Sequence, residues 1–213
     1  MEYIMFPGTQ IKASRLGMGA MRLPLDSSGA IDEKAASEML QYGIDHGLNY
    51  LDTAFPYLGQ TCEAFLGKFL KNGNREKVTL VTKLPVWLVK TREDMDRLLD
   101  EQLEKLQTDH VDFYLLHALN KERFELMKQL DYKQFFADKI REGKIRYPGF
   151  SFHDDHETFM SILNDYDWKL AQVQMNILDV DQQATLDGIK AAAEKGTGVV
   201  IMEPHRFPFQ PPP

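Results

Sequence analysis

Cysteine is nearly missing from the sequence, and extended apolar segments are missing altogether. Cys62 is the single cysteine among 213 residues, which excludes internal disulfides and any metal or iron–sulfur site built from cysteines alone. We interpret it as a small apolar residue on a helix face. No apolar segment approaches the ~18 residues of a membrane span, and the first residues lack the basic and apolar regions of a secretory leader. We therefore expect a cytoplasmic protein without a membrane partner.

An excess of positive charge is also missing. The chain has 25 Lys and Arg residues against 32 Asp and Glu residues, which is a formal net charge of −7. Such a chain has no general attraction for nucleic acid, so any anion site has to be a local basic pocket. The composition, with 43% hydrophobic and 27% charged residues, is that of a globular protein. We expect one domain that buries roughly 70% of its unfolded surface.

Short apolar runs alternate with amphipathic helical patterns along the chain. This alternation is typical of a parallel sheet built from strand–helix–strand units. Two short runs on either side of Pro7 and Gly8 predict an antiparallel hairpin over residues 2 to 13, before the repeat begins. Seven strands are then expected, near residues 16–21, 49–54, 78–83, 111–117, 145–150, 170–176 and 198–203.

Polar residues precede the helical patterns, as expected of N-caps that accept hydrogen bonds from free backbone N–H groups. These residues are Asp32, Thr91 with Asp94 in a capping box, Asn120, Asp155 and Asp181. The apolar spacing after Asn120 predicts one helical stretch that ends at Gly143. The segment from His153 to His156 also invites a metal interpretation, but a polar loop with Asp155 as the N-cap is favoured, and no metal site is expected.

Two folds alternate strands and helices in this way, an open doubly wound sheet and a closed barrel. No Gly-x-Gly-x-x-Gly follows the first strand, and polar strand ends are spread over many units, so we predict an α/β fold of the TIM (β/α)8-barrel type. After the seventh strand the sequence changes to a Pro-rich stretch. We therefore expect an incomplete barrel over residues 1–204, lacking the eighth strand–helix unit, followed by a separate tail over residues 205–213.

Four polar side chains are placed at or just after the ends of predicted strands. Asp52 lies near the end of one strand with Tyr57 in the loop that follows, and Lys83 and His117 end the next two strands. In such barrels, catalytic groups come from the C-terminal ends of several strands, which meet at one rim. The sequence therefore predicts that an acid, a phenol, an ammonium and an imidazole lie together there.

This set of groups suits the reduction of a carbonyl to an alcohol. A nicotinamide cofactor has to supply the hydride, because no side chain donates one, and a side chain supplies the proton. We expect Tyr57 to be the proton donor, with its pKa lowered by Lys83, since an ammonium about 4 Å away contributes about 4 kcal/mol at an effective dielectric of 20. Asp52 would hold Lys83, and His117 would bind or polarise the substrate oxygen.

Together these segments resemble the aldo-keto reductase family. The resemblance extends from about residue 17 to residue 204, over Leu-Gly-Met-Gly-Ala-Met-Arg-Leu, Asn-Tyr-Leu-Asp-Thr-Ala, Thr-Lys-Leu-Pro, Asp-Phe-Tyr-Leu-Leu-His, Gly-Lys-Ile-Arg, Gly-Phe-Ser and Gln-Val-Gln-Met-Asn. It implies a truncated member of that family in which Asp52, Tyr57, Lys83 and His117 form the catalytic tetrad.

The same resemblance implies NADPH or NADH as the cofactor, with Ser151 and Gln174 at the positions that hold the nicotinamide carboxamide. It implies a small aldehyde or ketone as the substrate. In the family, the chain continues after the position of Pro204 into a loop and an eighth strand, which carry much of the phosphate and adenosine binding. The tail over residues 205–213 does not match that continuation.

Two alternative functions are left open by the residues. Lysines at strand ends of barrels form imines, so Lys83 would also suit a Schiff-base aldolase. The change of composition at residue 205 fits a non-catalytic remnant of the family. A sheet of seven strands cannot close with eight-strand geometry, so we also expect the unpaired edges of its first and last strands to favour self-association.

Overall fold

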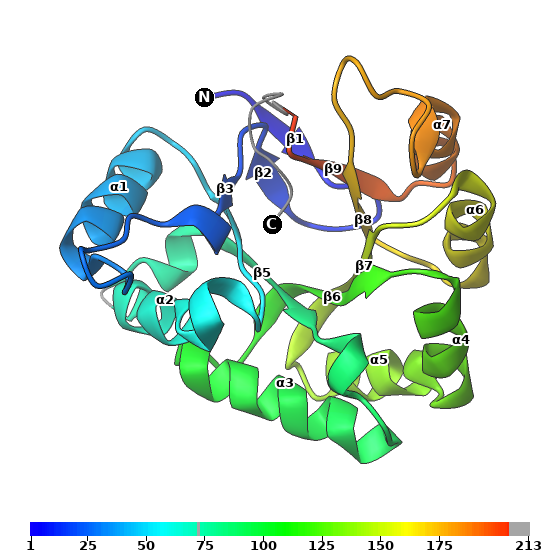
Figure 1. Ribbon diagram of the computed structural model, residues 1–213, viewed down its shortest axis with the longest axis horizontal. Helices are drawn as coiled ribbons and strands as arrows, with labels where there is room; N and C mark the ends of the chain where they lie inside the picture. The colour runs from blue at the N-terminus through cyan, green and yellow to red at the C-terminus, as the bar shows by residue number, and fades with distance from the viewer. Residues whose placement is uncertain (72, 205–213) are drawn as a thin grey trace.

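A curled parallel sheet with helices on its outer surface forms the computed structural model, which describes residues 1–71 and 73–204 (Figure 1). Within these residues, seven parallel strands pair in chain order from β3 to β9. Their bounds are β3 Met18–Gly19, β4 Tyr50–Asp52, β5 Thr79–Leu84, β6 Val111–Leu119, β7 Ile145–Phe152, β8 Leu170–Gln174 and β9 Gly198–Met202. The predicted strands and the incomplete barrel fold are confirmed over the described residues, whereas the expected tail over residues 205–213 lies outside them.

Seven α-helices in the described part of the chain cover the outside of the sheet. They are α1 Glu33–Asp45, α2 Cys62–Leu70, α3 Arg92–Leu106, α4 Lys121–Gln129, α5 Tyr132–Arg141, α6 His156–Asp165 and α7 Thr185–Glu194. The side chains of Asp32, Asn120 and Asp155 each accept a backbone N–H of the following helix. Thr91 and Asp94 form the expected capping box. These N-caps are confirmed.

Two helix predictions were wrong. The stretch from Asn120 to Gly143 is two helices, because Asp131 adopts a left-handed conformation with φ 52° and its side chain caps α5. Asp181 does not cap the next helix, since α7 begins only at Thr185. The apolar spacing continues across the break at Asp131, so the periodicity did not reveal it. No helix in the two described segments has the length and apolar character that a membrane crossing needs.

The predicted hairpin is also confirmed and closes the amino-terminal end of the sheet. Strands β1 (Tyr3–Met5) and β2 (Lys12–Ser14) pair antiparallel, and the turn between them directs Phe6 into the curl. There the ring of Phe6 lies 5.1 Å from that of Phe113, between ring centroids. A Cβ on Gly198 would meet the Phe6 ring at 2.3 Å, so β9 begins with glycine because this ring passes so close to its backbone.

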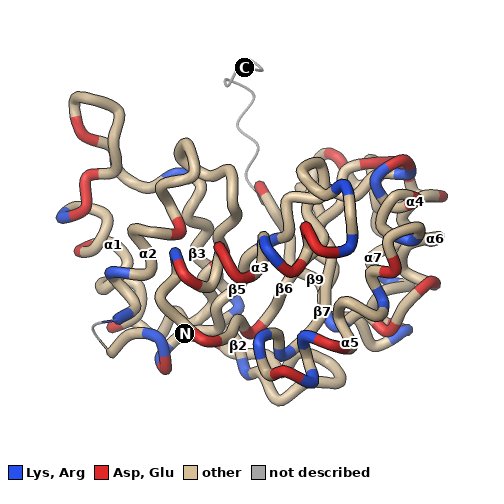
Figure 2. Tube along the Cα trace, turned by 90° about the horizontal axis from the view of Figure 1, so that it is seen from below, with Lys and Arg blue, Asp and Glu red and all other residues tan. Residues whose placement is uncertain are grey.

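Charged residues of both signs interleave on the outer helices. Figure 2 shows Lys and Arg positions between Asp and Glu positions along α3 and α5. Ion pairs join the two helices, with Lys139 Nζ 2.9 Å from Asp96 Oδ1 and Arg92 Nη2 3.6 Å from Asp138 Oδ2. These pairs tie neighbouring helices together across the outer layer that supports the sheet.

The sheet has two open edges among its described strands. Strand β3 pairs only with β4, and β9 pairs only with β8. Between them lies a cavity of about 580 Å³ that both edges line, and we call it the edge cavity. Leu16 beside β3 is 63% exposed and Ile201 in β9 is 37% exposed. Apolar side chains therefore face solvent along edges whose outer backbone groups have no strand partner among the described residues.

These open edges predict self-association. We expect the purified chain to form concentration-dependent dimers or larger species in light scattering, because unpaired strand edges pair with one another. Replacing Ile201 by Lys places a charge on the β9 edge and should reduce the association. Tyr42→Lys adds the same charge on the exposed surface of α1 and serves as the control. A wild-type chain that stays monomeric at every concentration contradicts the prediction.

Candidate active site

The structure brings together the four side chains predicted to meet at one rim. Asp52 is the last residue of β4, and Tyr57 begins a short turn, Tyr57–Gln60, that follows it. Lys83 lies near the end of β5, and His117 lies near the end of β6. Because β4, β5 and β6 are consecutive parallel strands of the sheet, their C-terminal ends place these groups side by side.

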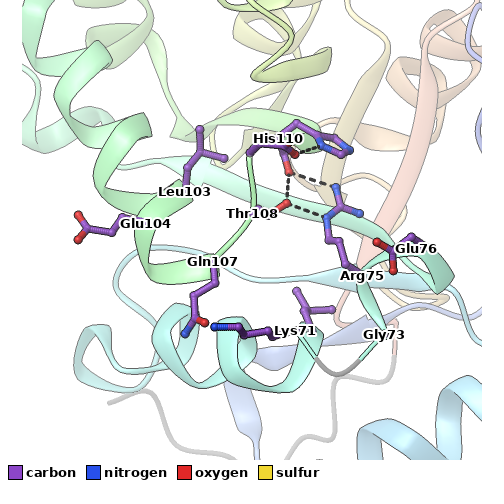
Figure 3. A pocket seen from close by; sticks show the side chains of 11 residues that line it. Lys71, Gly73, Arg75, Glu76, Leu103, Glu104, Gln107, Thr108 and His110 are labelled. Atoms are coloured by element: carbon purple, nitrogen blue, oxygen red, sulfur yellow. Dashed lines mark hydrogen bonds and ion pairs between the residues drawn. The ribbon is translucent and has the colours of Figure 1, made fainter.

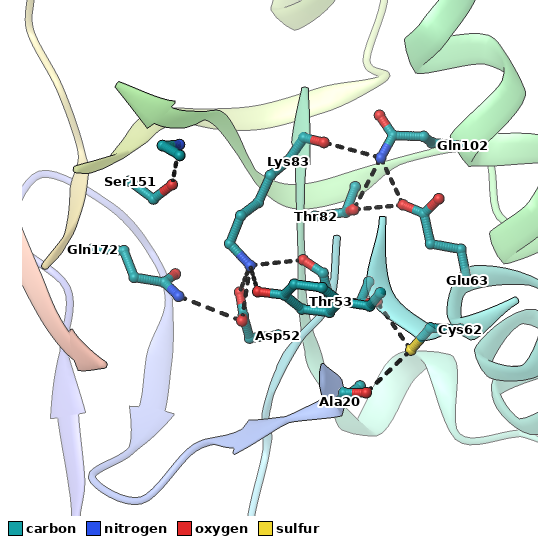
Figure 4. A network of polar contacts seen from close by, with 12 residues as sticks. Ala20, Asp52, Thr53, Cys62, Glu63, Thr82, Lys83, Gln102, Ser151 and Gln172 are labelled. Atoms are coloured by element: carbon teal, nitrogen blue, oxygen red, sulfur yellow. Dashed lines mark hydrogen bonds and ion pairs between the residues drawn. The ribbon is translucent and has the colours of Figure 1, made fainter. Parts of the chain in front are cut away.

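The ammonium group of Lys83 is the centre of the site (Figure 4). Its Nζ atom lies 2.7 and 2.8 Å from the two carboxylate oxygens of Asp52. It also donates to the backbone carbonyl of Thr53 at 2.8 Å and to the Tyr57 hydroxyl at 3.1 Å. Only 1% of Lys83 is exposed. A buried ammonium needs an opposite charge and full hydrogen bonding, and both are present here.

These contacts determine the charge of Lys83. Burial alone would lower the pKa of Lys83, but the negative charge of Asp52 and the hydrogen bonds from Lys83 to Asp52 and Tyr57 raise it above its usual value. Lys83 is therefore an ammonium with its donors engaged. Imine formation requires a neutral amine, which depends on a lowered lysine pKa. The geometry thus argues against the aldolase alternative.

The pKa of Tyr57 is shifted in the opposite direction to the one expected from Lys83 alone. Burial raises the pKa of Tyr57 most strongly, the charge of Lys83 lowers it, and the charge of Asp52 raises it again. The net shift is upward, because the lysine charge does not offset the loss of hydration. Tyr57 therefore holds its proton firmly at neutral pH while its hydroxyl stays in contact with the ammonium.

His117 joins the site through its ring. The imidazole packs edge-on against the Tyr57 ring with 6.2 Å between centroids, and Trp87 lies against it at 5.1 Å. Burial, aided by the charge of Lys83, lowers the pKa of His117 to about 2. The imidazole is therefore neutral at physiological pH. Its Nδ1 atom is buried without a hydrogen-bond partner in the described structure, which leaves a polar group available to a ligand.

Two polar groups of the site were missed by sequence reasoning. Gln172 donates to Asp52 Oδ2 at 3.3 Å, and its Oε1 atom is buried without a partner among the described groups, as is the Tyr50 hydroxyl. Both residues line the edge cavity together with Asp52 and Tyr57. Strand periodicity offered a signal for Gln172, because residues two apart on β8 point to the same face and Gln174 was already a candidate.

The two residues expected to hold a cofactor lie on the neighbouring strands β7 and β8. Ser151 is buried, and its hydroxyl oxygen accepts the backbone N–H of Ala118 at 2.7 Å. The side chain of Gln174 donates to Glu203 at 3.1 Å and accepts from Gln183 at 2.8 Å. Both residues are therefore tied to neighbouring segments at the carboxyl-terminal end of the sheet.

A buried polar network supports Lys83 from the outer side of β5 (Figure 4). One oxygen of Glu63 accepts hydrogen bonds from Thr82 and Gln102, both at 2.6 Å. Gln102 also donates to the backbone carbonyl of Lys83 at 3.1 Å and accepts from the Tyr114 hydroxyl at 2.7 Å. The sequence contained a signal for this network, since Glu63 and Gln102 are polar residues on otherwise apolar helix faces.

A larger cavity of about 790 Å³ lies away from these residues (Figure 3). It is lined by residues that directly precede β5 and β6, so it is at the opposite end of the strands from Lys83. Its Arg75 side chain is held by Thr108, by the carbonyl of His110 and by an ion pair with Asp112 at 3.1 Å. These contacts give Arg75 a structural role, and the cavity contains none of the predicted catalytic groups.

The remaining residues that the sequence analysis considered, Cys62 and the segment from His153 to His156, make contacts that support the fold. Cys62 is fully buried, its Sγ lies 3.3 Å from the carbonyl of Ala20, and burial raises the pKa of its thiol to about 11. The segment from His153 to His156 forms the loop in which Asp155 caps α6. Across residues 1–71 and 73–204, no group of three or more His, Cys, Asp or Glu side chains is placed to hold a metal ion.

Comparison with known sequences gives a consistent set of relatives. A sequence model described as the aldo/keto reductase family matches residues 15–209. The Bacillus subtilis oxidoreductase YrpG is 28% identical over 237 residues, which cover 96% of this chain and 66% of YrpG. The aldo-keto reductase YhdN of the same organism is 33% identical over 154 residues, which cover 66% of this chain and 45% of YhdN. The chain thus spans less than two thirds of these relatives.

Solved structures give the same result for the fold. The aldo-keto reductase AKR11C1 from Bacillus halodurans, in its holo form, superposes with a TM-score of 0.80 at 26% identity, covering 95% of this chain and 66% of that one. The aldo/keto reductase from Klebsiella pneumoniae in complex with NADP and acetate has a TM-score of 0.73 at 26% identity, covering 92% of this chain and 66% of that one.

The buried network predicts a pH dependence of stability. Burial raises the pKa of Glu63 above its usual value of 4.5. Glu63 therefore binds a proton more tightly in the folded protein than in the unfolded chain. The contribution of this protonation to the free energy of unfolding is complete below pH 4.5 and is lost as the pH rises through the folded-state pKa of Glu63. We expect Glu63→Gln to remove this loss. The unfolding temperature of the variant, relative to that of the wild type, should therefore increase between about pH 4 and about pH 8.

Thermal unfolding followed by circular dichroism measures this difference. Glu194→Gln, on the exposed side of α7, is the matched control and should change the unfolding temperature little at any pH. Parallel curves for the wild type and Glu63→Gln would show that the buried carboxyl does not contribute to the pH dependence.

Proposed function

The chain belongs to the aldo/keto reductase family, and from that premise we propose that it reduces aldehydes or ketones to alcohols with a nicotinamide cofactor as the hydride source. Tyr57 is the proton donor in this proposal. The observation that carries it is the hydrogen-bonded set of Asp52, Lys83 and Tyr57 beside the neutral imidazole of His117. This set provides a proton, a fixed positive charge and a polar group for the substrate oxygen at one rim.

The residues around the edge cavity fit the polar ring of a nicotinamide cofactor. The orphaned Oε1 of Gln172 can accept an N–H of the carboxamide, and the cavity reaches Tyr57. Arg15 and Arg22 line the same cavity, and phosphate groups would replace their exposed ion pairs with Glu2 and Glu203. NADP in the Klebsiella pneumoniae relative supports NADPH or NADH as the cofactor.

Ser151 and Gln174 complete the proposed carboxamide site. The Ser151 hydroxyl accepts from Ala118 and keeps its own proton available for donation. Gln174 would exchange its contacts with Glu203 and Gln183 for the carboxamide, because both ends of its amide are engaged. These two residues thus hold the ring, and Gln172 supports it from the adjacent position on β8.

The proposed mechanism follows from the charges of the site. A nicotinamide cofactor held by Ser151, Gln172 and Gln174 would supply the hydride that reduces the carbonyl carbon. Tyr57 donates its phenolic proton to the oxygen on which negative charge develops, and the nearby ammonium of Lys83 stabilises the phenolate that remains. Asp52 keeps Lys83 charged and in place. The neutral imidazole of His117 donates its N–H to the substrate oxygen and orients the carbonyl toward Tyr57.

A variant of Tyr57 tests the proton donor. Tyr57→Phe should lower kcat for carbonyl reduction by about 100-fold or more, because the proton loses its donor while the rest of the site is kept. Its affinity for NADPH should be almost unchanged. Tyr42→Phe, on the exposed surface of α1, is the matched control. Full reductase activity in Tyr57→Phe would remove Tyr57 from the mechanism.

A titration with NADPH tests the cofactor. We expect saturable binding to the folded, monodisperse chain, followed by nicotinamide emission and tryptophan quenching. Gln172→Leu should weaken this binding, because the carboxamide loses an acceptor that has no other partner among the described residues. A folded sample that binds neither NADPH nor NADH would favour the non-catalytic alternative over a reductase.

A further inference from the structure

A second cation, Arg123, lies next to the candidate active site where α4 begins beside Trp87, and we call this place the mouth of the site. Arg123 lies in the first turn of α4, and its Nη1 donates to the backbone carbonyl of Ala118 at 2.7 Å. The guanidinium lies over the ring of Trp87, 5.5 Å from its centroid. Trp87 in turn contacts the imidazole of His117. Arg123, Trp87 and His117 therefore form a continuous row that leads from the surface to the proposed reaction centre.

Arg123 has no acidic partner within 4.0 Å in the part of the chain that the structure describes, residues 1–71 and 73–204. Acidic residues outnumber basic ones by 32 to 25 in the chain, so carboxylates are plentiful. The other arginines at positions 15, 22, 75, 92, 97, 141 and 146 all make such pairs. Arg123 thus keeps an uncompensated charge at the mouth.

The charge of Arg123 affects the pKa of His117 inside the site. Burial is the main cause that lowers the pKa of His117, the charge of Lys83 adds to it, and Arg123 contributes in the same direction. Because Trp87 contacts both the Arg123 guanidinium and the His117 imidazole, a ligand bound beside His117 would lie one aromatic ring away from the guanidinium. Trp87 is 42% exposed and offers a flat apolar surface between the two groups.

We infer that the site selects carbonyl compounds that carry a carboxylate, with Arg123 as the receptor of that carboxylate. The inference rests on the proposed function and names its substrate class. A guanidinium that lies over an aromatic ring keeps N–H donors at its edge, and these match the two oxygens of a carboxylate. The substrate would span the Trp87 surface, with its carbonyl at Tyr57 and His117 and its carboxylate at Arg123.

A matched pair of aldehydes tests this inference. 4-Formylbenzoate and its methyl ester share the same reacting carbonyl, but only the first carries a charge. We expect kcat/KM to favour 4-formylbenzoate by about tenfold or more, mainly through KM, because a charge-assisted hydrogen bond stabilises binding by that order. Arg123→Met should remove the preference and leave reduction of the ester nearly unchanged. Arg123→Lys should retain part of it, since the charge remains without the planar pair of donors.

Two results would overturn the inference. One is a wild-type chain that reduces both aldehydes equally well. The other is an Arg123→Met variant that loses NADPH affinity but keeps the ratio between the two aldehydes, because Arg123 would then serve the cofactor. Arg141→Met is the control for loss of an arginine, since Arg141 lies exposed on α5 and pairs with Asp138. It should keep the wild-type preference.

A binding measurement separates this inference from the proposed function. The alcohol product of 4-formylbenzoate, 4-(hydroxymethyl)benzoate, should quench the fluorescence of Trp87 saturably and should bind about tenfold more weakly to Arg123→Met. Trp87→Phe identifies the source of the signal. Quenching without reduction of either aldehyde would keep the carboxylate site and reject the reductase. Reduction of both aldehydes without preference or quenching would reject the carboxylate site alone, and the absence of both activities would reject both proposals.

Discussion

The buried ion pair between Lys83 and Asp52 is the interaction on which the site depends. Moving an ammonium out of water costs several kcal/mol unless an opposite charge and hydrogen bonds replace the lost hydration. Asp52 supplies the charge, and Thr53 and Tyr57 supply the remaining acceptors. Since Lys83 and Asp52 come from neighbouring strands, the same contact joins β4 to β5 and sets the position of the phenol. Gln102 holds the Lys83 backbone from the other side.

The open edge of the sheet links the fold to the chemistry. Tyr50 and Gln172 point to the inner side of the curl, and each keeps a buried polar atom without a partner in the described structure. These two residues line the cavity between β3 and β9, where Asp52 and Tyr57 also lie. Among the described residues the sheet curls without pairing its two edges, and this leaves a cavity beside the Tyr57 phenol. The same arrangement leaves apolar strand edges exposed to solvent.

The two cations near His117, Lys83 and Arg123, differ in whether a carboxylate pairs with them. Lys83 is compensated inside the site, whereas Arg123 at the mouth makes no ion pair among the described residues. Burial, the charge of Lys83 and further contributions from His153 and Arg123 lower the pKa of His117 and keep the imidazole neutral. In the proposals made above, the neutral imidazole of His117 binds the carbonyl of the substrate, and the guanidinium of Arg123 binds its carboxylate.

Local patterns in the sequence were sufficient for the strands, most N-caps and the meeting of Asp52, Tyr57, Lys83 and His117. Strand ends and caps depend on neighbouring residues, and parallel strands bring their C-terminal ends to one rim in every such sheet. The break at Asp131, the roles of Glu63, Gln102 and Gln172, and the upward pKa shift of Tyr57 needed the tertiary structure. Burial is the sum of contacts from segments far apart in the chain, so no local pattern encodes it. The tertiary structure was also needed to find that Arg123 has no ion pair among the described residues, because ion pairing depends on distances in space.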